Sequence, residues 1–89
     1  MIQEEVVIAN AMGLHARAAA RFVQVASRYR SRIQVSRQNT TADGKSILGL
    51  LALLGTLGTR LTISADGPDA EEAVRVLADL VAARFGEPQ

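Results

Sequence analysis

The chain has 89 residues and a net charge of +1, a size that supports one domain with a modest core. Its apolar fraction is 48%, yet it contains only two Phe and one Tyr, so the core must be mainly aliphatic. The lack of cysteine excludes disulfides and thiolate metal sites, and a single histidine excludes a multi-histidine metal site. We therefore expect no metal or other cofactor, and the small net charge is untypical of nucleic-acid-binding proteins.

The N-terminal segment Met1–Glu5 lacks the basic and apolar regions of a secretory signal. The longest apolar stretch, Ile47–Leu57, is far shorter than the ~20 residues that a membrane-spanning helix needs. These features predict a soluble cytoplasmic protein without membrane insertion.

The first half of the chain predicts a strand, a helix and a pair of strands. Glu5–Ala9 is short and β-branched, and from Ala16 to about Tyr29 apolar residues recur at helical spacing. Arg32–Arg37 alternates between polar and apolar residues, and Thr40–Ala42 follows a tight turn. The apolar stripe of the helix contains Ala19, Phe22, Val23 and Ala26, its polar stripe contains Arg17, Arg21, Gln24 and Arg28, and Ile33 and Val35 point inward from the second strand.

The second half predicts a short helix, a strand and a longer helix. Ser46 is a suitable N-cap for a helix from Ile47 to about Leu54. Arg60–Ala65 alternates as a strand, and Pro68 and three acidic residues suit the start of the last helix. The inward residues are expected to be Leu61 and Ile63 in the strand and Ala70, Ala73, Val74, Leu77, Leu80 and Val81 in the helix, with Arg84 near its end.

The predicted order is therefore β-α-β-β-α-β-α within a single domain over residues 1–89. Alternating strands with one polar face indicate an antiparallel sheet covered by helices on its other face. The fold class is an α+β two-layer sandwich.

His15 is the chain's only histidine and is expected at or beside the N-cap of the first helix. The first amides of a helix lack intrahelical acceptors and favour an anion, so Ala16 and Arg17 N–H groups next to the imidazole suit a phosphoryl group. The Arg17 guanidinium could also bind phosphate oxygens. The alternative is a surface or capping histidine without a chemical task. The sequence suggests no Ser, Cys or carboxylate near His15, which favours a relay completed by another protein over an independent enzyme.

The short helix after Ser46 is apolar on every face, which indicates either an enclosed helix or one with an exposed binding surface. With Leu50, Leu53 and Leu54 turned inward, Ile47, Leu48 and Leu51 would form an exposed docking patch. The basic residues Arg17, Arg21 and Arg28 are either a solvated face or a surface that steers an acidic partner.

Ser46 has a structural interpretation as an N-cap and a second one as a phosphorylation site beside the apolar patch. The Gly44-Lys45-Ser46 segment is not a Walker loop, because that pattern requires glycine where Asn39 stands.

Three segments of the chain closely resemble the HPr family, the histidine-containing phosphocarriers of the bacterial sugar phosphotransferase system. They are Gly-Leu-His-Ala-Arg at 13–17, Gly-Lys-Ser-Ile-Leu-Gly-Leu at 44–50 and Thr-Ile-Ser-Ala-Asp-Gly at 62–67. The resemblance implies an open-faced sandwich of four antiparallel strands with three helices on one face. It also implies a monomeric carrier that accepts phosphate on Nδ1 of His15 from phosphorylated enzyme I and passes it to a IIA domain.

By the same resemblance Arg17 assists the phosphate, Ser46 is the serine modified by an ATP-dependent kinase in some bacteria, and Ile47, Leu48 and Leu51 dock partners. The family usually has proline where this chain has Ala18, so we expect a slightly less rigid phosphate site.

Two other functions remain to be weighed. One is a regulatory HPr-like module, in nitrogen-related or carbon-catabolite control, that acts through Ser46 and the apolar patch without sugar transport. The other is a ligand-binding or RNA-binding α+β module, which the lack of aromatic residues on the strands disfavours.

Overall fold

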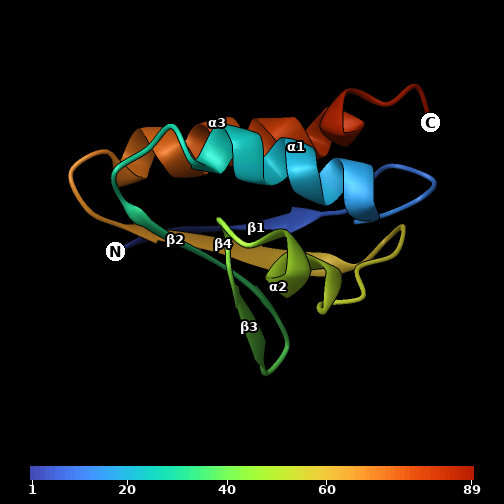
Figure 1. Cartoon of the computed structure of the whole chain (residues 1–89), viewed down its shortest axis with the longest axis horizontal. Coiled ribbons are helices and arrows are strands. Elements are labelled where there is room, and N and C mark those ends of the chain that lie inside the picture. The colour runs from blue at the N-terminus through green and yellow to red at the C-terminus, as the bar shows by residue number, and fades with distance from the viewer.

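The computed structural model describes all residues, Met1–Gln89, and contains one four-stranded antiparallel sheet in the order β1-β4-β2-β3 (Figure 1). The central strand β4 pairs with β1 from Ile2↔Ala65 to Val7↔Arg60 and with β2 from Arg32↔Asp66 to Ser36↔Thr62. The strands are β1 (Ile2–Val7), β2 (Arg32–Arg37), β3 (Thr40–Asp43) and β4 (Arg60–Asp66).

Helices cover one face of this sheet and leave the other open. The long helices α1 and α3 run side by side above the strands, and the short α2 packs against α1 and β3 (Figure 1). This arrangement confirms the predicted open-faced α+β sandwich. The helices are α1 (Ala16–Ala26), α2 (Ile47–Leu51) and α3 (Ala70–Ala82), and a 3-10 turn η1 (Arg84–Gly86) follows.

The core lies between the sheet and the helices and is almost entirely aliphatic, as the composition predicts. Ile33 and Val35 of β2 and Leu61 and Ile63 of β4 point into it, and Phe22 of α1 is its largest helical side chain. No helix in the structure combines the length and the apolarity that a bilayer crossing requires.

The first two elements differ from the predicted ones at their ends. β1 covers Ile2–Val7 instead of Glu5–Ala9, because main-chain pairing with β4 includes the polar residues at its start. α1 ends at Ala26 instead of Tyr29, since Asp69 accepts hydrogen bonds from the N–H groups of residues 30 and 31 and draws the chain out of the helix.

The prediction for the short helix was wrong at its end. α2 stops at Leu51, and Leu54 adopts a left-handed φ of 56° with 71% of its surface exposed. Leu50 and Leu53 are buried as predicted. These two leucines fill the core beside α2, so Leu54 is not needed there.

The inward faces of the two long helices are also slightly rotated from the predicted stripes. In α1 Val25 is buried and Val23 is half-buried, and in α3 Ala78 is buried while Leu80 is half-buried. In both helices the alanines of the stripe are buried, whereas the larger residue at its edge is only half-buried. Pro68 precedes the N-cap Asp69 and therefore lies two positions before Ala70, the first residue of the helix, instead of in its first turn.

Candidate functional site

His15 is the N-cap of α1, with extended backbone angles of φ −81° and ψ −179°. The first intrahelical hydrogen bond runs from Ala19 N–H to the His15 carbonyl, so the amides of residues 16–18 have no acceptor in the helix. No side chain caps this end. The predicted position of His15 at the positive end of the helix is therefore confirmed.

The turn before His15 is held by close contact with the loop after α2. Leu14 N–H donates to the Gly55 carbonyl at 2.8 Å, and Leu14 is buried. Gly13 has a φ of +67°, and a Cβ there would lie 2.4 Å from the Gly55 carbonyl oxygen. Only glycine fits this approach, and the anchored turn fixes where the imidazole emerges.

A carboxylate from the far end of the chain contacts the imidazole. Glu87 Oε2 lies 2.5 Å from His15 Nε2, and the two side chains are 16% and 23% exposed. Glu87 Oε1 accepts a hydrogen bond of 2.9 Å from Asn10 Nδ2, which also donates to the Gly13 carbonyl at 2.8 Å. The hydrogen bonds from Asn10 and then from His15 lower the pKa of Glu87, with a smaller contribution from the charge of Arg17.

A tight C-terminal turn brings Glu87 to this position. Phe85 is buried in the core, and Arg84, Phe85 and Gly86 all have positive φ values, between 55° and 84°. Two consecutive left-handed residues other than glycine are strained and persist only where the surroundings hold them. The buried phenyl ring provides that hold and directs the chain back over the start of α1.

The expectation that no carboxylate lies near His15 is therefore wrong. Glu87 is 72 residues away in the sequence, and only the return of the chain after α3 brings it close. The one signal in the sequence is an aromatic residue, Phe85, beyond the last helix. It indicates that the C-terminal segment packs on the core, but not which residues it contacts.

A pocket of about 480 Å³ surrounds the imidazole and includes Arg17 among its lining residues. A neighbouring groove of about 450 Å³ is lined by Arg17, Arg21 and Ile47 and so joins the acceptor region to the apolar surface of α2. Arg17, Arg21 and Arg28 are all exposed, which agrees with the predicted basic stripe. The lining of the first pocket is Ala11, Met12, His15, Ala16, Arg17, Glu87, Pro88 and Gln89.

Ser46 is the N-cap of α2, as predicted, and its hydroxyl accepts a 3.0 Å hydrogen bond from Gly49 N–H. The adjacent apolar surface is smaller than predicted. Ile47 and Leu48 are 40% and 80% exposed, but Leu51 is half-buried against the core. Leu54, which was expected inside, is exposed instead.

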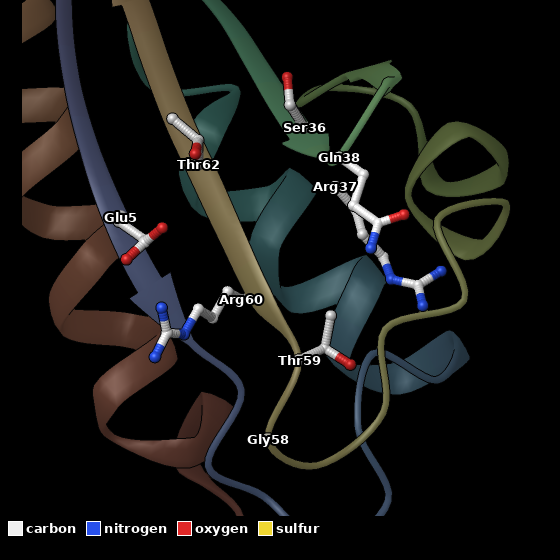
Figure 2. Close-up of a pocket in the computed structure, with 8 residues that line it drawn as sticks. All are labelled: Glu5, Ser36, Arg37, Gln38, Gly58, Thr59, Arg60 and Thr62. Atoms are coloured by element: carbon white, nitrogen blue, oxygen red, sulfur yellow. The ribbon is translucent and has the colours of Figure 1, made fainter.

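A larger hollow of about 600 Å³ lies on the open face of the sheet and is lined only by polar residues and glycine (Figure 2). Glu5 and Arg60 project from β1 and β4, whereas Arg37 turns toward the loop after α2 (Figure 2) and donates to the Leu53 carbonyl at 3.2 Å. The hollow contains no histidine. The candidate phosphoryl chemistry therefore belongs to the smaller pocket at His15.

Comparison with known proteins gives a consistent result along the whole chain. A family model described as the phosphotransferase-system HPr component phosphorylation site matches residues 2–83. The phosphocarrier protein HPr of Cupriavidus necator is 42% identical over 87 residues, 98% of each chain, and the HPr-like protein Crh of Bacillus subtilis is 40% identical over 81 residues, 91% of this chain and 95% of Crh.

The fold matches solved structures of the same kind. A crystal structure of HPr from Thermoanaerobacter tengcongensis superimposes with a TM-score of 0.95 and 43% identity, and the match covers 100% of both chains. Family match, sequence identity and fold agree, and we conclude that this chain belongs to the HPr family of phosphocarrier proteins of the phosphotransferase system.

Proposed function

We propose that His15 is the residue that carries the phosphoryl group, which it takes from phosphorylated enzyme I in the cytoplasm and passes to a IIA domain. The observation that supports this most directly is the position of the only histidine, at the uncapped N-terminus of α1 and in an open pocket. The family match includes this residue, since it covers residues 2–83.

The proposed reaction uses the ring nitrogen that faces away from Glu87. The Nδ1 lone pair forms the new bond to phosphorus, while the bond from phosphorus to the donor breaks and its electron pair returns to the donor. Delivery to the IIA domain reverses this sequence. The partner proteins supply the remaining groups, so the chain acts as a stoichiometric monomeric carrier and not as an enzyme by itself.

The backbone amides of Ala16 and Arg17 are placed to receive phosphoryl oxygens, because they lie at the positive end of α1 without helical acceptors. The exposed Arg17 guanidinium lines the same pocket and adds a charged donor. Ala18 lacks the ring that fixes the backbone at the usual proline, so we expect a slightly less rigid phosphate site, although alanine adds one N–H donor.

Docking is proposed to use the surface next to this pocket. Ile47 and Leu48 supply apolar contact, the half-buried Leu51 supports them, and Arg21 supplies charge across the shared groove. Ser46 lies at the edge of this surface, where a phosphate would favour the N-terminus of α2 but oppose an apolar partner. Regulation through Ser46 is therefore the second part of the proposal.

Incubation with phosphoenolpyruvate and enzyme I should label the protein with one acid-labile phosphate. His15→Ala should abolish this label, whereas Met12→Ala, at an exposed position of the same pocket, should retain it. Label that persists in folded His15→Ala would refute the assignment, as would the absence of label on the native protein in the presence of active enzyme I.

A further inference from the structure

We propose that Glu87, held by Asn10, is a positioning residue that keeps a proton on Nε2 of His15 and leaves the Nδ1 lone pair free for phosphoryl transfer. This inference rests on the proposed function of His15 and deepens it. It adds a residue that lies beyond the 2–83 segment matched by the family model.

The orientation of Asn10 is determined by its neighbours. Its Nδ2 lies at hydrogen-bond distance from two acceptors, the Gly13 carbonyl and Glu87 Oε1, so the amide cannot be turned around without losing both bonds. In this orientation the fully buried Oδ1 has no hydrogen-bond donor. Leaving a buried acceptor without a partner costs free energy. The structure accepts this cost because the same orientation lets Nδ2 donate a hydrogen bond to Glu87.

The carboxylate then determines which ring nitrogen is protonated. An ionised carboxylate has only acceptors, so the 2.5 Å contact requires hydrogen on His15 Nε2. In the neutral ring the other nitrogen, Nδ1, consequently holds a lone pair. The hydrogen bond also fixes the ring orientation, as a carboxylate does for many catalytic and metal-binding histidines.

The same contact serves both directions of transfer. When Nδ1 forms its bond to phosphorus, the ring that still bears the Nε2 proton becomes positively charged, and the Glu87 carboxylate faces that charge. When the phosphoryl group leaves, the electron pair of the N–P bond returns to Nδ1 and the ring departs as neutral imidazole. Without the Nε2 proton it would have to depart as an imidazolate anion, a much poorer leaving group.

The charged groups around the pair agree with this assignment. Arg17 is the other charged residue of the pocket, and its positive charge favours the ionised form of Glu87. The remaining groups that line the pocket are uncharged side chains of the loop before α1 and of the C-terminal segment.

The test compares Glu87→Ala with the native protein in two measurements. Nitrogen-15 NMR of the neutral His15 ring reports the tautomer without any phosphoryl donor, and the initial rate of labelling by enzyme I reports transfer. We expect native protein to hold the proton on Nε2, and Glu87→Ala to show a mixture of tautomers and labelling slowed by about 10- to 100-fold. Glu71→Ala, an exposed acidic position on α3 without a side-chain hydrogen bond, should change neither measurement.

Glu87→Gln separates geometry from charge, because its amide oxygen can still accept from Nε2 although the negative charge is lost. Its labelling rate should fall between those of the native protein and Glu87→Ala. Asn10→Ala should move both measurements in the same direction as Glu87→Ala and add little to it in the double variant, since the two residues act on one ring.

An unchanged labelling rate in Glu87→Ala, or a slower rate with an unchanged nitrogen-15 signature, would overturn the positioning role. Either result leaves the carrier function of His15 intact. Loss of the carrier function would instead be seen as label that survives His15→Ala, so the two failures are distinguishable.

Discussion

The Asp69 carboxylate and Ser31 join the start of α3 to the start of β2. Asp69 Oδ1 accepts hydrogen bonds from the Ser31 N–H at 2.9 Å and the Ser31 hydroxyl at 2.5 Å, and Oδ2 accepts from the Arg30 N–H at 2.9 Å. The Ser31 hydroxyl in turn accepts from the Asp69 N–H at 3.2 Å. This cluster fixes the turn that follows α1 against the turn that precedes α3.

The cluster should make stability depend on acid pH. The hydrogen bonds from the Ser31 side chain and then the Arg30 backbone lower the pKa of Asp69 from 3.8 to about 2. A carboxylate with a lowered pKa stabilises the folded state above the unfolded pKa and loses this contribution as the pH falls through the folded value. The stability gap between native protein and Asp69→Asn should be constant above pH ~5 and narrow progressively as the pH falls toward ~2.

Urea unfolding across this range measures the gap. Asp79→Asn, at an exposed position on the same helix without a side-chain hydrogen bond, should follow the native curve. A native–Asp69→Asn gap that does not change with pH would contradict the expectation.

Arg17→Ala should impair transfer far more than folding. The guanidinium lines the acceptor pocket and is exposed, so its loss removes a charged phosphate donor while costing within about 0.5 kcal/mol of stability. We expect initial labelling by enzyme I to slow about 100- to 1000-fold, in the range found when a preorganised donor is removed. Arg28→Ala, at an exposed arginine just after the end of α1, serves as control. Equal losses of rate and of thermal stability in Arg17→Ala would argue against the proposed role.

Leu48→Asp should weaken docking without unfolding the protein. Leu48 is 80% exposed, so the change costs within about 0.5 kcal/mol of stability but places a charge in an apolar contact. We expect at least an order-of-magnitude loss in affinity for enzyme I by calorimetry, as for a buried unpaired charge at an interface. Val7→Asp, 49% exposed on β1, is the matched control. Native affinity in Leu48→Asp would place the docking surface elsewhere.

Leu51→Asp is a poorer test than Leu48→Asp, because Leu51 packs against the core.

Ser46→Ala removes the hydrogen bond to Gly49 N–H and should lower the free energy of unfolding by about 1 kcal/mol. Ser46→Asp keeps an acceptor and adds negative charge at the N-terminus of α2, so it should be more stable than Ser46→Ala. Ser46→Asp should also bind enzyme I more weakly than the native protein. The control Ser27→Ala, at an exposed serine without a side-chain hydrogen bond, should change neither the stability nor the affinity for enzyme I. If Ser46→Asp binds enzyme I with native affinity, Ser46 does not belong to the docking surface.

The sequence predicts well the features that depend on neighbouring residues. The alternation in β2 predicts its bounds, Arg32–Arg37, and the capping preferences place both His15 and Ser46 at helix N-termini. Hydrophobic periodicity alone would extend α2 to Leu54, but the helix ends when Leu50 and Leu53 have filled the available corner of the core.

The partners of His15 were not predictable in the same way. Asn10 and Glu87 carry no local pattern that marks them, because one is a loop residue before α1 and the other follows the last helix. Their contact depends on the path of residues 84–86 through left-handed backbone angles, and on the burial of Phe85. Such a path is set by the packed tertiary structure and not by residue preference.

The strained turn at Arg84–Gly86 has a practical consequence for work on this carrier. It directs any polypeptide joined after Gln89 toward the mouth of the pocket at His15, whereas the N-terminus lies at the opposite end of the molecule (Figure 1). An affinity handle or fluorophore fused in front of Met1 would keep clear of incoming donors and acceptors, and one fused behind Gln89 would crowd them.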